Sequence, residues 1–165
     1  MCILFLDVDG VLNRAGFQPE GTLDLVSWIE PELAARVDRV ARELGAELVL
    51  SSDWRIRHSI DDLRAQLARA GIAAPLCGTT PELGGQPRWR EIEAWMVEHR
   101  IDRDDIAIVD DGQAMGPLSR RHVRVDSRVG FDDAAAATTR ALFGATAAPC
   151  PPLRPAAAAA IEPES

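Results

Sequence analysis

The sequence contains no lysine and no tyrosine, so several kinds of active site are excluded at once. All 18 residues of the lysine and arginine class are arginine, and 26 aspartates and glutamates outnumber them, which gives a formal net charge of -8. A Schiff-base lysine, the lysine of a P-loop and a tyrosine nucleophile cannot occur. Because the chain has no lysine, a long cationic side chain that holds a phosphate here must be arginine, whose planar guanidinium suits that task.

Cysteines and long apolar runs are also scarce, which bears on where the protein is located. Cys2, Cys77 and Cys150 are scattered and odd in number, so we expect free thiols in a reducing compartment. The apolar run 3–6 is far too short for a signal peptide or a membrane span. The negative net charge argues against general charge-driven binding to membranes or nucleic acids, although it is compatible with a local basic groove. We therefore expect a cytoplasmic protein with no membrane partner.

Apolar runs and amphipathic segments alternate along the chain. Strands are expected at 3–6, 47–50, 72–76, 106–109 and 122–125. Helices are expected at 31–44, 60–70, around Ile92 to Met96, and from Asp132 or Asp133 to 143. This order predicts an α/β fold: a doubly wound parallel sheet with helices on both faces. We expect residues 1–144 to form one domain and the Pro- and Ala-rich residues 145–165 to be a disordered tail.

Polar side chains follow three of the expected strands at the point where each strand ends. The three sets are Asp7 with Asp9, Ser51 with Ser52, and Asp110 with Asp111. In open parallel sheets, ligands bind beyond the carboxyl ends of the strands. Four carboxylates at one small site would repel one another unless a cation neutralised them. Oxygen ligands with no histidine or cysteine nearby favour Mg²⁺, which shares its coordination shell with substrate phosphate.

Two pairs of neighbouring residues compete for the role of phosphate ligand. Arg88 and Arg90 lie at the expected start of the third helix, and Arg88 is favoured because it can reach the N-terminal end of that helix. Ser51 is favoured over Ser52 because it lies nearest the strand.

The segments FLDVDGVLN, VLSSDW, an arginine-led helix and IVDDG occur in the order, and at the strand ends, of the haloacid dehalogenase-like (HAD) phosphohydrolases. The chain resembles this family over about residues 2–143, with a Rossmann-like HAD fold. The gaps between the motifs are too short for a cap domain, so it looks like a capless member with a small flap near 12–22. The combination of Ser-Ser-Asp-Trp-Arg, a later Arg-x-x-Glu-Ile-x-x-Trp and the Asp-Asp pair is most similar to the HAD domains associated with RNA repair proteins.

The resemblance implies a role for each acid. Asp7 would be the nucleophile that forms an aspartyl-phosphate. Asp9 would protonate the leaving oxygen and later activate water. Mg²⁺ would be held by Asp7, the backbone carbonyl of Asp9, and Asp110 or Asp111 or both. An acid at the Asp9 position favours phosphate-ester chemistry over the carbon–halogen cleavage of other family members.

The resemblance also implies that Ser51 binds a phosphoryl oxygen and that Arg88 offsets its charge. The family usually has lysine at this last position, so arginine is a departure. Trp54 and Arg55, next to the serines, are interpreted as substrate contacts, a stacking platform and a phosphate ligand, with core packing and a surface ion pair as the alternatives.

We therefore expect an Mg²⁺-dependent phosphatase that hydrolyses phosphate monoesters, with RNA or DNA ends among its candidate substrates. Two alternatives remain: a non-catalytic metal- and phosphate-binding module of a nucleic-acid repair system, and a phosphatase of small metabolites. An open site of this kind is compatible with a partner protein or a second copy of the chain acting as a lid.

Overall fold

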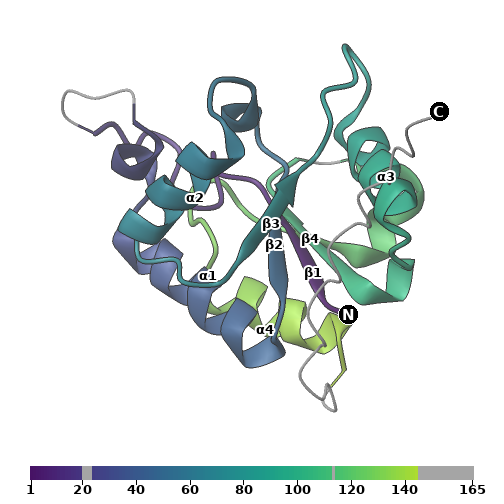
Figure 1. The fold of residues 1–165 in the computed structure, drawn as a ribbon. Helices are drawn as coiled ribbons and strands as arrows, with labels where there is room; N and C mark the ends of the chain where they lie inside the picture. The colour runs from purple at the N-terminus through teal and green to yellow at the C-terminus, as the bar shows by residue number, and fades with distance from the viewer. Residues whose placement is uncertain (20–23, 113, 145–165) are drawn as a thin grey trace, which may run out of the picture.

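The computed structural model describes residues 1–19, 24–112 and 114–144, and its centre is a five-stranded, fully parallel sheet. The strand order is β3-β2-β1-β4-β5 (Figure 1). The strands are β1 (Ile3–Leu6), β2 (Glu47–Leu50), β3 (Leu76–Thr79), β4 (Ile106–Asp110) and β5 (His122–Arg124). Since β1 lies in the middle of the sheet, whatever follows β1 lies at the centre of its carboxyl edge.

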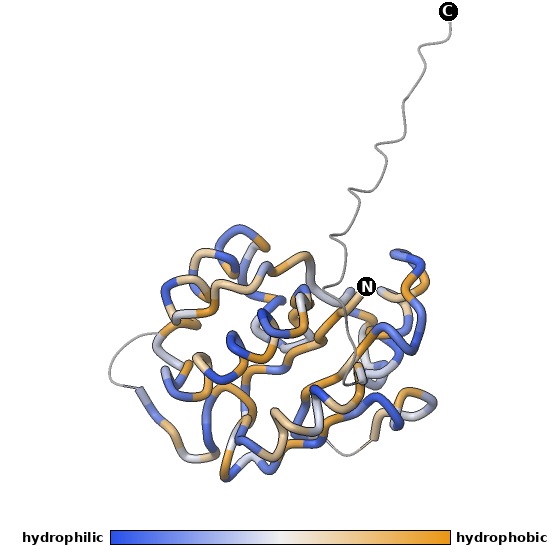
Figure 2. Tube along the Cα trace, turned by 90° about the horizontal axis from the view of Figure 1, so that it is seen from below, coloured by the Kyte–Doolittle hydropathy of each residue, from blue (hydrophilic) through white to orange (hydrophobic). Residues whose placement is uncertain are grey.

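Helices cover both faces of the sheet, as the alternating pattern predicts. On one face lie α1 (Pro31–Leu44), α2 (Ile60–Arg69) and α4 (Asp133–Leu142), and on the other lies α3 (Arg88–His99) (Figure 1). Successive side chains of β1 alternate between the two cores: Leu4 and Leu6 pack on the first face, and Ile3 and Phe5 on the second. Figure 2 shows hydrophobic residues along the strands, with hydrophobic and hydrophilic residues alternating along the helices.

Short 3₁₀ helices complete the connections between these elements. They are η1 (Leu25–Trp28), η2 (Asp53–Ile56), η3 (Arg103–Asp105) and η4 (Gly116–Arg121). In the described part of the chain, the segments before α1 and between β2 and α3 contain no further sheet or helical bundle, so the domain has no cap there. Part of the expected flap near 12–22 lies outside the described residues, and so does all of the expected tail at 145–165.

One expected strand is displaced along the sequence. The pattern predicts a strand at 72–76, but β3 begins at Leu76. The reason is a contact with α1: the backbone N–H groups of Ala73 and Ala74 both donate to Asp38 Oδ1, at 2.7 and 2.8 Å. These donors are therefore used by a helix side chain and not by the neighbouring strand.

The cysteines do not all remain thiols. Cys2 is disulfide-bonded, so the expectation of three free thiols is wrong, and it no longer supports a cytoplasmic location. Cys77 is a free cysteine, and burial raises the pKa of its thiol to about 12.

Among the described helices, none is both long enough and apolar enough to cross a membrane.

Candidate active site

The strand register gathers the predicted acids and serines at one edge of the sheet. Leu6, the last residue of β1, is the register partner of both Leu50 of β2 and Val109 of β4. The residues that come next therefore meet at the carboxyl edge: they are Asp7, Ser51 and Asp110. The juxtaposition predicted from the sequence is present in the structure.

Three carboxylates form the centre of this edge. Oxygen atoms of Asp7, Asp110 and Asp111 all lie within 4.8 Å of one another. Burial and the neighbouring Asp110 raise the pKa of Asp7 from 3.8 to about 7, against the opposing effect of Arg88. Burial and Asp110 also raise the pKa of Asp111. Hard carboxylate oxygens at this separation, too crowded to ionise together, fit a divalent cation such as Mg²⁺.

The backbone after β1 is shaped to let these acids approach. Gly10 has φ +79°, a left-handed conformation that glycine adopts without strain. A Cβ atom at this position would clash with Asp111 Oδ2. The glycine of the Asp-x-Asp-Gly motif is therefore needed for both the turn and the close packing of the loop after β1 against the loop after β4.

Two polar groups beside Asp7 are buried and have no hydrogen-bond partner among the described residues: Ser51 Oγ and Arg88 Nη1. Arg88 begins α3 and extends toward the acids, with Nη1 4.0 Å from Asp7 Oδ1 and Nη2 3.4 Å from Asp53 Oδ1. Trp28 Nε1 and Thr80 Oγ1 are likewise buried and unpartnered. Since buried polar groups are rarely left unpaired, a serine hydroxyl and a guanidinium next to a carboxylate suggest a ligand with several acceptor oxygens.

The competing residues are engaged elsewhere. Ser52 Oγ accepts the Trp54 backbone N–H at 3.4 Å and so caps η2. Arg90 lies over the Trp89 ring and forms a 3.7 Å ion pair with Glu93, and its side chain is 54% exposed. Geometry therefore favours Ser51 and Arg88 as the phosphate-facing pair.

Asp9 is exposed and is held by two side chains. Asn13 Nδ2 donates to Asp9 Oδ1 at 3.1 Å, and Trp54 Nε1 donates to Asp9 Oδ2 at 3.2 Å. Asn13 also accepts the Gly10 N–H and donates to the Trp28 carbonyl, so it ties the loop after β1 to η1. Asn13 was not predicted from the sequence; the signal was an asparagine three residues after the motif glycine, where its side chain can close a turn.

Trp54 and Arg55 have different surroundings. Trp54 is half-buried and contacts the rings of Trp28 and His58. The Arg55 side chain is only 4% exposed, and its guanidinium pairs with Glu91 of α3 at 2.8 Å. It also donates to the backbone carbonyls of Ser52 and Thr80, at 2.9 Å each. Arg55 is therefore a buried clamp beneath the site, which corrects both the interpretation as a substrate contact and the alternative of a surface ion pair.

This clamp predicts a large stability effect. Arg55→Met should lower the free energy of unfolding by about 3–5 kcal/mol, because it leaves the Glu91 carboxylate buried without its cation. Arg57→Met, which changes an exposed arginine of the same loop, should change it by less than about 0.5 kcal/mol. Urea denaturation of both variants measures this. Equal stability of the two would show that the clamp contributes nothing.

The raised pKa of Asp7 predicts how the metal-free protein responds to pH. Asp7 binds its proton more tightly when folded, so its contribution to stability is complete below pH 3.8 and is lost as the pH rises through about 7. In chelator, the stability of the wild type relative to Asp7→Asn should fall across this window, by on the order of 4 kcal/mol. Urea midpoints of both proteins from pH 4 to 8 measure the difference. A difference that does not change with pH would contradict it.

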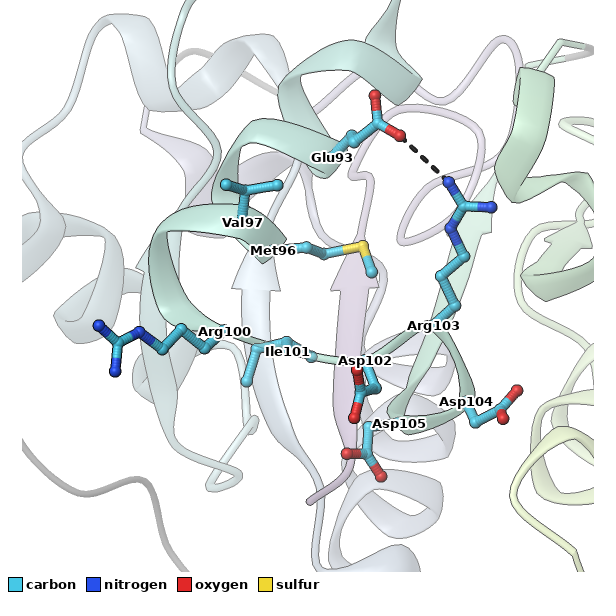
Figure 3. A pocket seen from close by; sticks show the side chains of 9 residues that line it. All are labelled: Glu93, Met96, Val97, Arg100, Ile101, Asp102, Arg103, Asp104 and Asp105. Carbon is cyan, nitrogen blue, oxygen red and sulfur yellow. Dashed lines mark hydrogen bonds and ion pairs between the residues drawn. The ribbon is translucent and has the colours of Figure 1, made fainter.

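Pockets of very different character lie at the two ends of the sheet. Next to the acids, a pocket of about 240 Å³ is lined by Asp9, Asp53, Trp54 and Arg57. A larger pocket of about 710 Å³ lies between the end of α3 and the start of β4, at the opposite edge (Figure 3). Its charges lie on the rim, where Arg103 pairs with Glu93 at 3.2 Å, and none of its lining residues carries an unpartnered buried polar atom. Among the described residues, the buried polar groups without hydrogen-bond partners therefore lie away from the larger pocket.

Comparison with known proteins matched the chain to a family model. Residues 3–136 match the family model described as "HAD domain in Swiss Army Knife RNA repair proteins". The match includes all the candidate site residues, from Asp7 to Asp111. Searches of curated proteins and of solved structures found no match to the chain.

Proposed function

The chain belongs to the family of HAD domains in Swiss Army Knife RNA repair proteins, and from this premise we propose that it is an Mg²⁺-dependent phosphatase of phosphate monoesters. Membership of the HAD family supports a phosphatase-type function in general. The observation that carries the proposal here is that two buried groups near Asp7, Ser51 Oγ and Arg88 Nη1, have no hydrogen-bond partner among the described residues.

In the proposed reaction, Asp7 and Asp9 act together in two successive displacements at phosphorus. A carboxylate oxygen of Asp7 attacks phosphorus, the ester P–O bond breaks, and Asp9 gives its proton to the departing oxygen. Water then attacks the aspartyl-phosphate, Asp9 takes a proton from it, and phosphate leaves while the Asp7 carboxylate is restored. Asp9 suits this role because it is exposed to solvent, whereas Asp7 is buried.

The other residues act by electrostatics and orientation. Mg²⁺ held by Asp7, Asp110, Asp111 and the backbone carbonyl of Asp9 would neutralise the carboxylates and polarise the phosphoryl oxygens. Ser51 would donate its hydroxyl proton to one phosphoryl oxygen and Arg88 its N–H groups to others. Binding phosphate would thus satisfy both orphaned donors.

The proposed substrates are phosphorylated RNA or DNA ends. The family description links these domains to RNA repair. The absence of a cap over the described part of the site leaves room for a macromolecule. A second protein could complete the enclosure of the reacting group.

A substrate panel tests this function. With Mg²⁺, the protein should release phosphate from 3′- or 5′-phosphorylated oligonucleotides with higher kcat/KM than from sugar phosphates or free nucleotides. A preference for small esters would contradict the nucleic-acid substrate but retain the phosphatase. Failure to release phosphate from any ester, with retained Mg²⁺ and oligonucleotide binding, would contradict the phosphatase and indicate a binding module.

A further inference from the structure

Asp9 is the general acid of the proposed reaction, and a hydrogen bond from the Trp54 indole links it to the rest of the site. Asp9 has two carboxylate oxygens, and a different side chain donates to each: Asn13 to Oδ1 and Trp54 to Oδ2. Asn13 lies on the same loop as Asp9, whereas Trp54 lies 45 residues later in η2. Trp54 is therefore the contact that fixes Asp9 relative to the end of β2, where Ser51 lies.

We infer that Trp54 is a positioning residue, whose indole N–H orients Asp9 for proton transfer to the leaving group. This inference rests on the proposed phosphatase function. The 240 Å³ pocket lined by Asp9, Asp53, Trp54 and Arg57 borders the carboxylate that Trp54 holds. A leaving group that takes its proton from Asp9 occupies this space, so Trp54 both forms its wall and aims the acid into it.

Four further interactions hold Trp54 itself in place. Ser52 caps η2 through the backbone N–H of Trp54. Arg55, the next residue, clamps η2 to α3 through the buried pair with Glu91. The Trp54 ring also contacts Trp28 and His58, with ring centroids 6.3 and 5.8 Å away. A rigid base of this kind is what a positioning residue requires, because small displacements of a catalytic group are costly.

Trp28 provides a contrast within the same aromatic cluster. Its indole Nε1 is buried and has no hydrogen-bond partner among the described residues. Trp28→Phe and Trp54→Phe therefore remove the same atoms from neighbouring rings, but only the second removes a hydrogen bond to the acid. Comparing the two variants therefore separates the loss of the hydrogen bond to Asp9 from the loss of ring packing.

The chemistry of the leaving group provides the readout. An alkoxide, such as the ribose oxygen of an oligonucleotide, leaves poorly unless it is protonated, whereas p-nitrophenolate leaves without a proton. The value of kcat/KM reports only the steps up to release of the leaving group, so the later role of Asp9 as a base does not enter. Loss of acid positioning should therefore be visible for oligonucleotides and nearly invisible for p-nitrophenyl phosphate.

The experiment compares kcat/KM of the wild type, Trp54→Phe and Trp28→Phe on a phosphorylated oligonucleotide and on p-nitrophenyl phosphate. Trp54→Phe should lose about 10- to 100-fold on the oligonucleotide and less than about 3-fold on the aryl ester. Its Ki for inorganic phosphate should stay unchanged, and Trp28→Phe should change neither ester by more than about 3-fold. In an Asp9→Asn background, Trp54→Phe should cause no further loss, because the two residues act as one unit.

Equal losses on both esters, an equal loss in Trp28→Phe, or additive losses with Asp9→Asn would overturn the inference while the phosphatase function stands. Absence of turnover by the wild type would overturn the proposed function and this inference with it. If Trp54→Phe does not fold, benzothienylalanine at position 54, which replaces the indole N–H with sulfur at nearly constant shape, gives the same comparison.

Discussion

Asp7→Asn is expected to reduce Mg²⁺-dependent phosphate release by at least about 10³-fold, because a neutral amide cannot form the aspartyl-phosphate. Asp7 is the central member of the acid cluster, 4.0 Å from the Arg88 guanidinium, and the pKa of its carboxyl is raised to about 7 by burial and Asp110. Replacing it removes repulsion as well as the nucleophile. Loss of activity should therefore come with equal or greater stability of the metal-free protein at pH 7.

Phosphate release and thermal unfolding should be measured on the same preparations of this variant. Asp61→Asn is the matched control, since Asp61 lies on α2 and its side chain is 88% exposed. Among the described residues, its carboxylate pairs with Arg64. It should keep wild-type turnover. Turnover surviving in Asp7→Asn would remove Asp7 from the mechanism, and a large loss of stability would show that inactivity reflects unfolding.

Arg88→Met is expected to lower kcat/KM by about 10²- to 10³-fold, and Arg90→Met by less than about 3-fold. Arg88 Nη1 is buried, lies 4.0 Å from Asp7 Oδ1 and has no hydrogen-bond partner among the described residues, whereas Arg90 is exposed and lies over Trp89. The two arginines are two residues apart on one helix, so each serves as the control for the other. Arg88→Lys keeps the charge and should retain more activity than Arg88→Met.

Steady-state kinetics on one phosphorylated oligonucleotide measures these effects. A larger loss in Arg90→Met than in Arg88→Met would reverse the assignment. Equal, small losses would mean that neither arginine stabilises the transferring phosphoryl group. Since the chain has no lysine, no lysine can take over this role.

The sheet and the meeting of Asp7, Ser51 and Asp110 could be predicted from the sequence, because short apolar runs specify buried parallel strands and their carboxyl ends share one edge. The displacement of β3 could not. It depends on Asp38, a residue of α1 that binds two backbone N–H groups 35 and 36 positions later. Periodicity carries no information about such a long-range contact.

The sequence favours Ser51 over Ser52 and Arg88 over Arg90 by position alone, and the hydrogen-bond partners of these residues lie beyond what it shows. Ser51 and Ser52 differ only in their partners: the second caps η2 and the first has none among the described residues. Arg55 reads as a surface cation next to the phosphate site, yet it is buried against Glu91, 36 residues later. Hydrogen-bond partners, which only the fold reveals, decide each of these cases.

The most direct test of the proposed mechanism is a crystal structure of the protein with Mg²⁺ and beryllofluoride, a stable mimic of an aspartyl-phosphate. The proposed mechanism predicts beryllium bonded to a carboxylate oxygen of Asp7, fluorine atoms accepting from Ser51 Oγ and Arg88, and Mg²⁺ beside Asp110 and Asp111. It also predicts that Asp7→Asn binds no beryllofluoride, as ¹⁹F NMR can check. Beryllofluoride bound through another carboxylate, or contacted by Ser52 and Arg90 in place of Ser51 and Arg88, would contradict it.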